Sequence, residues 1–553
     1  MNASPASLGI ITRENIAMPM RDGVALRANL FLPDAPGPFP ALLHRTPYGK
    51  AAAGYERYVR AGYAVLSQDA RGRYASDGEF VPFTEPETPD GEDGYDSVEW
   101  LADQAFCNGR VGTIGASYDA WMQWQLARLK PQHLRAMCAY TIPLELTQVD
   151  WPGAFKPGRR IKWWRTTMAP DMRRRAGLGP PHTPAEARRQ WDEDEQGSWL
   201  GFMPWRQMPD FLPPPLDCYA AAWLADPARC PWKLDEIHAQ VEVPNLDFSG
   251  WYDHCNGTLG HLGLMQRQGG SPVARQHSKL VVGPWNHPGL GKREIYGVDF
   301  GPQAQVDLPD IIIRWFDHWL KGIDNGVEGE PALRYFVMGS GQWKGAATWP
   351  PPEIGRVTYY LGAGSLDRAA GADGAADYTY DPRDPVPTLW TADLFSGPAD
   401  RRRLEYRDDI LYFRSPPLAE AVEVVGGAQV ELWISSSAPD TDFFARLVDE
   451  EPEGPALEVC YGMVRARHRN SLKCEEFLVP DQPTLLTVEL GPTAIRFAPG
   501  HRIRLEITSS DFPNHDRNHN TGGDDLAEVE LRAARQRVYY GSQRSSRLLL
   551  PLV

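Results

Sequence analysis

Ser117 lies in the stretch Val111-Gly-Thr-Ile-Gly-Ala-Ser-Tyr-Asp-Ala120, where its hydroxyl has the setting of a nucleophile. Residues 111–114 have the character of a buried strand end, and residues 118–128 have the apolar spacing of a helix that stops before Pro131. A strand, a tight turn and a helix expose the serine hydroxyl above the helix N-terminus, which stabilises developing negative charge. The usual pattern is G-x-S-x-G, but Asp119 replaces the second glycine here. The same short motif also fits a strand-to-helix turn whose serine has no catalytic role.

A nucleophilic serine needs a general base and a carboxylate that orients the base. Two later segments each end a predicted strand with a suitable residue: Phe248-Ser-Gly-Trp-Tyr-Asp253 and Val282-Gly-Pro-Trp-Asn-His287. The order Ser, Asp, His is that of α/β-hydrolase folds, and parallel strands bring their carboxyl ends to one edge of a sheet. Asp253 alone also fits a helix cap, and His287 alone also fits a surface loop. Together with Ser117, they predict a Ser117–His287–Asp253 triad.

An acyl-transfer site also needs donors for the oxyanion. The backbone N–H of Tyr118, directly after the nucleophile, is one candidate. The loop after the predicted strand 41–44 supplies Tyr48, whose phenol O–H is a second candidate donor. A tyrosine between Pro47 and Gly49 is also typical of simple packing.

The bulk composition describes an ordinary globular protein. The chain has 553 residues, too many for one core, and a net charge of −15, which argues against nucleic-acid binding. No basic and apolar leader and no apolar run of membrane-spanning length is visible, so we expect no membrane association. The seven cysteines form no C-x-x-C pair, which favours reduced thiols in the cytoplasm over a disulfide or zinc scaffold.

The order of predicted elements indicates an α/β fold with additions. Strands and helices alternate from about residue 40 to 142, as in a mostly parallel sheet. Residues 143–237 are polar, proline-rich and helical in patches, and the α/β pattern then returns at 243–250 and 279–283. Residues 362–376 have few bulky side chains and are predicted to be a loop. Short strands separated by turns follow to the end, which predicts a β-sandwich or jelly roll.

Distinctive motifs occur along nearly the whole chain. They are Met20-Arg-Asp-Gly-Val24, Arg45-Thr-Pro-Tyr-Gly-Lys50, Gln68-Asp-Ala-Arg-Gly-Arg73, Gly115-Ala-Ser-Tyr118, Gly250-Trp-Tyr-Asp253, Gly283-Pro-Trp-Asn-His287 and Ser509-Ser-Asp-Phe-Pro513. Together they resemble those of one family, the cocaine esterase group, which belongs with X-Pro dipeptidyl-peptidases, glutaryl acylases and α-amino-acid ester hydrolases. One departure is Ala120, where the family usually has glycine.

The resemblance implies an α/β-hydrolase core at residues 1–143 and 241–350, an inserted helical cap at 144–240 and a C-terminal jelly-roll β-sandwich at 351–553. It implies the triad and oxyanion donors named above. Hydrolysis through an acyl-enzyme on Ser117 would need no metal or cofactor. The expected substrate is a small-molecule ester or amide. We expect an aromatic-lined pocket, for which the candidates are Trp151, Phe155, Trp163, Trp164, Trp251 and His254.

Several alternatives stay open at this point. An X-Pro aminopeptidase or a β-lactam-type acylase would use the same triad, and a glutaryl-type acylase would need cations such as Arg159, Arg160, Lys162 or Arg165. A carbohydrate-binding protein with an inert core is a candidate of another class. A metal-dependent hydrolase would use His254, His261 or the His515, Asp516 and His519 group, whose spacing fits no strong metal motif. A homo-oligomer is also left open.

Overall fold

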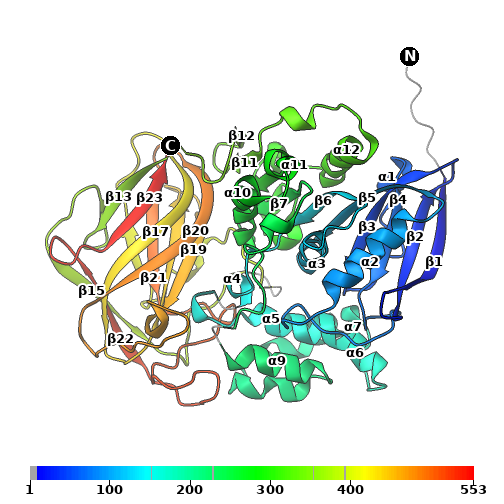
Figure 1. The fold of residues 1–553 in the computed structure, drawn as a ribbon. Coiled ribbons are helices and arrows are strands. Elements are labelled where there is room, and N and C mark those ends of the chain that lie inside the picture. The colour runs from blue at the N-terminus through cyan, green and yellow to red at the C-terminus, as the bar shows by residue number, and fades with distance from the viewer. Residues whose placement is uncertain (1–8, 151, 227–228, 353, 391–393) are drawn as a thin grey trace.

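The computed structural model describes residues 9–150, 152–226, 229–352, 354–390 and 394–553. Figure 1 shows three regions: an α/β region that holds the first strands, a group of helices below it, and a β-rich region that ends at the C-terminus. The predicted α/β core with a β-rich C-terminal domain is confirmed. No helix in the described ranges is both long enough and apolar enough to cross a membrane.

The α/β core is built on two sheets that meet edge to edge. The first has the order β1 (Ile10–Pro19), β2 (Ala25–Pro33), β4 (Ala64–Asp69), β3 (Phe39–Thr46), β5 (Cys107–Ala116) and β6 (Leu134–Tyr140). The second has the order β12 (Gln342–Ala346), β11 (Leu333–Val337), β8 (Lys279–Gly283) and β7 (Leu246–Gly250). A parallel bridge between Met137 and Asn245 joins β6 to β7. Because β3, β5, β6, β7 and β8 run parallel, the loops at their carboxyl ends share one edge.

Helices cover both faces of this core. Helices α2 (Asp90–Ala102) and α3 (Tyr118–Ala127) bury Leu101 and Trp121 in one apolar cluster. Helices α1 (Glu56–Arg60) and α12 (Leu308–Lys321) bury Val59 and Phe316 in another, on the opposite face. A Cβ at Gly112 of β5 would lie 2.5 Å from the Phe316 ring, so glycine is needed for α12 to pack this closely.

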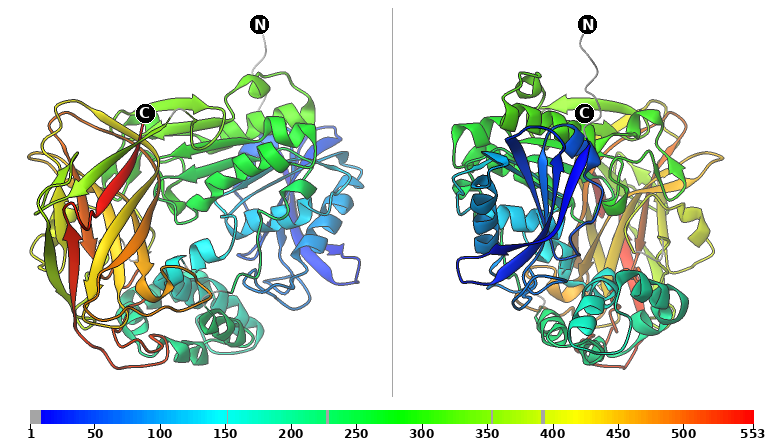
Figure 2. Two further views of the ribbon diagram at one scale, coloured as in Figure 1. Left: turned by 60° about the vertical axis from the view of Figure 1, so that its left-hand side comes forward. Right: turned by 90° about the vertical axis from the view of Figure 1, so that its right-hand side faces the viewer.

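The segment between β6 and β7 is helical and forms a cap. Figure 2 shows its helices grouped beneath the core and the β-rich domain. The helices are α4 (Thr147–Asp150), α5 (Gly158–Trp163), α6 (Ala169–Arg175), α7 (Pro184–Gln190), α8 (Gln196–Gly201) and α9 (Leu216–Ala225). The cap also contacts the C-terminal domain, since the N–H of Gly158 donates to the carbonyl of Asn514.

The C-terminal domain is a sandwich of two antiparallel sheets. One has the order β14 (Leu366–Asp367), β13 (Gly355–Leu361), β23 (Arg547–Leu552), β17 (Val422–Ser436), β22 (Ala534–Tyr540) and β15 (Gly374–Tyr380), with β20 (Thr484–Phe497) also on β17. The other has the order β16 (Leu411–Arg414), β21 (Arg502–Thr508), β18 (Asp442–Glu450) and β19 (Ala456–Arg465).

The loop predicted for residues 362–376 is partly wrong, because β14 and the first residues of β15 lie within it. Glycine and alanine give no side-chain signal for a strand. Gly374 nevertheless pairs with Tyr540, whose ring would lie 2.6 Å from a Cβ at that position.

Candidate active site

Ser117 occupies a strained turn between β5 and α3. Its backbone has φ 59° and ψ −123°, a left-handed conformation that costs a non-glycine residue free energy. The turn is held by its own hydrogen bonds: the N–H of Ser117 donates to the Tyr140 carbonyl, and the Trp121 N–H donates to the Ser117 carbonyl. Gly115 has φ +150°, and a Cβ there would lie 2.6 Å from Cβ of Asp119. The serine hydroxyl therefore leaves the sheet at the helix N-terminus, as a nucleophile elbow requires.

The buried Asp253 and the half-buried His287 form a carboxylate–imidazole pair. Nδ1 of His287 lies 3.0 Å from Oδ1 and 3.2 Å from Oδ2 of Asp253. The backbone N–H of Cys255 also donates to Asp253 Oδ1, over 2.8 Å, and the Asp253 side chain has no exposed surface. The ring of Phe395 stacks on the His287 imidazole with 5.6 Å between centroids. These contacts fix the ring and the tautomer with its proton on Nδ1, which leaves Nε2 as an acceptor.

The loops that carry this pair are tied to each other. The N–H of Trp251 donates to the Gly283 carbonyl, and the N–H of Tyr252 donates to the Trp285 carbonyl. A Cβ at Gly250 would lie 2.0 Å from the Trp285 carbonyl oxygen, so only glycine permits this approach. The ends of β7 and β8 thus hold Asp253 and His287 in a fixed relation.

Ser117 and His287 both line one cavity of about 420 Å³. The same cavity is also lined by Tyr48, Asp119 and His254. Among the described residues, no hydrogen bond joins Ser117 to His287. Catalytic hydrogen bonds of this kind are often long without substrate and shorten when the complex forms.

Tyr48 is placed to donate to an oxyanion. It lines the Ser117 cavity, and its ring lies edge-on to that of Tyr118, 6.3 Å away. Burial raises the pKa of the Tyr48 phenol, and the negative charge of Asp119 raises it further. The phenol therefore stays a neutral O–H donor. The side chain of Tyr118 is buried against Phe83 and Trp121, which leaves its backbone N–H, at the start of α3, as the group near Ser117.

A second carboxylate–imidazole pair lies behind the elbow, and the sequence analysis missed it. Asp119 Oδ2 lies 2.8 Å from Nε2 of His44, and Nδ1 of His44 hydrogen-bonds the Tyr55 hydroxyl. Burial raises the pKa of Asp119, and the His44 contact opposes that rise. The only signal in the sequence was a histidine at the end of the strand that precedes the Tyr48 loop.

The predicted pocket residues are distributed over several places. Trp163 and His254 line the Ser117 cavity. Trp164 is buried beside Trp163 in the cap, and Phe155 is buried against Phe444 and His515, away from the cavity. Trp251 donates from Nε1 to the Phe336 carbonyl and borders a neighbouring cavity. Trp151 lies outside the described residues. Phe83, Cys255 and Phe395, which no motif marked, also line the Ser117 cavity.

Cap cations surround the same cavity. Arg159, Arg160, Lys162 and Arg188 line it, whereas Arg165 packs its guanidinium over the Trp199 ring. Burial, followed by the charge of Arg159, lowers the pKa of His254 well below its usual range, so this imidazole is neutral.

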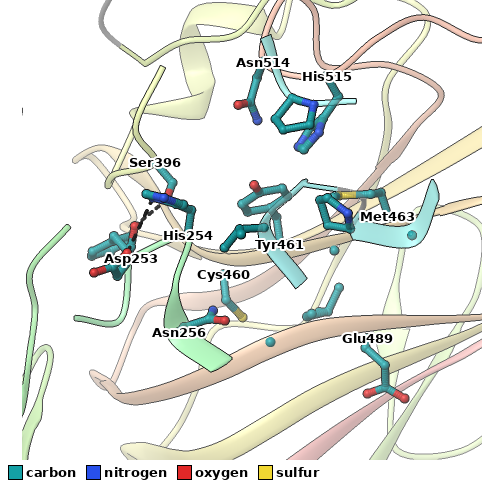
Figure 3. Close-up of a pocket in the computed structure, with 18 of the residues that line it drawn as sticks. Asp253, His254, Asn256, Ser396, Cys460, Tyr461, Met463, Glu489, Asn514 and His515 are labelled. Carbon is teal, nitrogen blue, oxygen red and sulfur yellow. Dashed lines mark hydrogen bonds and ion pairs between the residues drawn. The ribbon is translucent and has the colours of Figure 1, made fainter. Parts of the chain in front are cut away.

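A second cavity of about 410 Å³ adjoins the first between the core, the cap and the β-sandwich. Figure 3 shows His254, Tyr461 and His515 around it. The two cavities share Val149, Arg159 and His254. Both ring nitrogens of His515 are buried without a hydrogen-bond partner among the described residues, and burial lowers the pKa of His515 to about 3.

The other histidines considered as metal ligands are dispersed. His261 stacks on Trp124 and hydrogen-bonds His238. His519 lies near Asp525 and Glu528, in the β-rich domain and away from Ser117.

The chain is 33% identical to the cocaine esterase of Rhodococcus sp. over 98% of each chain. This protein belongs to the cocaine esterase family. The model of the X-Pro dipeptidyl-peptidase (S15) family matches residues 22–289, and that of the X-Pro dipeptidyl-peptidase C-terminal non-catalytic domain matches residues 325–549.

Two solved structures share the fold of this chain. An aminopeptidase from a marine sediment Thaumarchaeota archaeon aligns with a TM-score of 0.84 at 23% identity, covering 100% of this chain and 98% of that one. An α-amino acid ester hydrolase aligns with a TM-score of 0.77 at 23% identity, over 100% and 98% of the two chains.

Proposed function

We propose that this protein hydrolyses a small-molecule carboxylic ester or amide through an acyl-enzyme on Ser117. The family consists of enzymes that hydrolyse esters and amides. The similarity to the cocaine esterase extends over almost the full length of the chain. One observation supports the roles proposed for these residues. Ser117, in its strained turn, and His287, which is hydrogen-bonded to Asp253, line the same cavity. None of the seven cysteines forms a disulfide bond, which supports a cytoplasmic location as part of the proposal.

In the proposed mechanism, Nε2 of His287 takes the Ser117 proton as the hydroxyl oxygen attacks the substrate carbonyl. The oxyanion is stabilised by the Tyr118 N–H and the Tyr48 O–H, a neutral donor in a desolvated site. The imidazolium then protonates the leaving alcohol or amine. Water, deprotonated by His287, releases the acid in the second half-reaction. Asp253 stabilises the imidazolium in both steps.

The proposed substrate has an aromatic or apolar group beside its scissile bond. The cavity wall near Ser117 carries Phe83, Ile142, Trp163 and Phe395, which suit such a group. The X-Pro aminopeptidase alternative is less well supported, since Asp119 is the one carboxylate lining this cavity in the described structure and it is bonded to His44.

A carboxylate-bearing acyl group is a second candidate, because cap cations line the cavity. Arg188 is exposed at the wall, while its neighbour Arg189 is exposed but lies off the cavity. Arg188→Gln should raise KM for an ester with a terminal carboxylate more than for its neutral methyl analogue. Arg189→Gln is the matched control and should change neither. Equal effects of the two variants would remove this candidate.

The direct test of the proposed function is a panel of aryl, alkyl and dicarboxylic monoesters with the matching amides. Wild type should turn over at least one class, and Ser117→Ala should lose the activity by a factor of about 10⁴ or more. Activity that survives in Ser117→Ala would show that another group carries the chemistry.

A further inference from the structure

Four possible metal ligands lie together where the loops after β7 and β8 meet. They are Asp253, His254, Cys255 and His287, and one ligand atom of each lies within 4.8 Å of every other. Asp253 Oδ1 is 3.0 Å from Nδ1 of His287 and 3.5 Å from Nδ1 of His254. Ligand atoms around a tetrahedral Zn²⁺ are about 3.4 Å apart, from bonds of roughly 2.0–2.3 Å. The separations of Asp253 Oδ1 from the two imidazole nitrogens are therefore close to those in a coordination sphere.

His254 supplies a nitrogen that the hydrolytic mechanism does not use. Its Nδ1 is buried and has no hydrogen-bond partner within the described part of the chain, although it faces Asp253. Figure 3 shows the His254 ring directed at the Asp253 carboxylate. A buried unpaired nitrogen costs free energy, and a metal bond would satisfy it.

The donor types select the kind of cation. Two imidazoles, one thiol and one carboxylate suit Zn²⁺, Co²⁺ or Cd²⁺, whereas Mg²⁺ and Ca²⁺ prefer oxygen ligands. The Cys255 side chain is 3% exposed and lines the Ser117 cavity beside His254 and His287. The cluster thus opens to the space through which a cation would enter.

We propose that Asp253, His254, Cys255 and His287 bind one Zn²⁺ or similar thiophilic cation, and that this binding switches the hydrolase off. The cation takes the Nδ1 lone pair of His287, so the proton of the neutral ring moves to Nε2. The Cys255 thiol loses its proton to solvent and binds as thiolate. With Nε2 protonated and Asp253 engaged by the metal, His287 has no lone pair with which to accept the Ser117 proton. The inhibitory effect rests on the proposed function, but the metal site does not.

The activity test is a Zn²⁺ titration of wild type with and without EDTA. We expect complete inhibition that EDTA reverses, with Mg²⁺ and Ca²⁺ inactive at the same concentrations. Cys255→Ser and His254→Gln, each normalised to its own metal-free rate, should raise the half-inhibitory Zn²⁺ concentration at least ten-fold. Cys218→Ser/Cys474→Ser removes the two exposed thiols and should leave that concentration unchanged. Equal inhibition of wild type and Cys255→Ser, or its loss in the exposed-thiol variant, would overturn the proposal.

A binding test keeps the site separate from the activity. Co²⁺ titrated into full-length Ser117→Ala should give one equivalent of tetrahedral cobalt with a thiolate charge-transfer band, and Ser117→Ala/Cys255→Ser should lack that band. Absence of a saturable band in Ser117→Ala would refute the site even if the hydrolase assignment holds. A band without any hydrolase activity in wild type would instead refute the proposed function and leave the site intact.

Discussion

His44 Nε2 lies 2.8 Å from Asp119 Oδ2, which gives the elbow a second imidazole–carboxylate pair besides that of His287 and Asp253. Both side chains are largely buried, and the His44 ring is also bonded to Tyr55. Removing either partner deprives the other of this hydrogen bond. We expect His44→Ala and Asp119→Ala each to lower the free energy of unfolding by about 1–3 kcal/mol. Because the two share one interaction, the double variant should cost less than the sum. Additive losses in denaturant unfolding would show that the pair has no coupling.

Tyr48→Phe tests the oxyanion donor. The variant removes only the hydroxyl, so kcat should fall by about 10²–10³-fold while KM changes little. Tyr58→Phe is the control, since Tyr58 is a buried tyrosine on α1 outside the cavity. An unchanged kcat for Tyr48→Phe would assign the second donor to another group.

Gly250→Ala tests the link between the two loops that carry Asp253 and His287. The added Cβ would lie 2.0 Å from the Trp285 carbonyl oxygen, so the loops must separate. We expect kcat/KM to fall by about 10²-fold or more, because displacements of about 1 Å at a reacting centre have effects of this size. Gly371→Ala, whose Cβ meets nothing within 4 Å, should behave as wild type. Full activity in Gly250→Ala would mean that the loop contact is not needed.

Stability should decrease in acid because neutral histidines are buried in the core. Burial lowers the pKa of His238 from 6.5 to about 4, and burial also lowers the pKa of His261, its hydrogen-bond partner. Between pH 6.5 and about 4 the unfolded chain binds a proton at His238 that the folded chain does not. The free energy of unfolding therefore falls as pH decreases through this window, by about 2 kcal/mol for His238 between pH 7.5 and 5.

Urea unfolding of wild type and His238→Gln at both pH values measures this contribution. The pH dependence should be smaller in the variant by about that amount. An identical pH dependence in the two proteins would show that His238 is not the neutral group we describe.

The meeting of Ser117, Asp253 and His287 at one edge of the core could be predicted, because each residue follows a strand of strongly apolar sequence in a fixed order. Ser117, Asp253 and His287 needed only that order and the rule that parallel strands end at one edge. The pocket wall was not predictable in the same way. Phe395 comes from the β-rich part of the chain, and its stacking on His287 depends on how domains pack. Phe155 was assigned to the pocket from composition alone, which does not tell a lining aromatic from a buried one.

The strand content of residues 374–376 illustrates the same limit at the level of fold. Backbone pairing with β22 makes that segment a strand. Its small side chains show no alternation of apolar and polar residues that would predict one. The His44–Asp119 pair joins residues 75 positions apart, which one sequence does not reveal.

The central claim is that Ser117 is an activated nucleophile with His287 as its base. The most direct measurement is the rate and site of fluorophosphonate labelling, read by peptide mass spectrometry on wild type, Ser117→Ala, His287→Ala and Asp253→Asn. We predict a single adduct on Ser117, no adduct in Ser117→Ala, and labelling slowed by about 10³-fold or more in His287→Ala. An adduct on another residue, or labelling of Ser117 at equal rates in wild type and His287→Ala, would contradict the account.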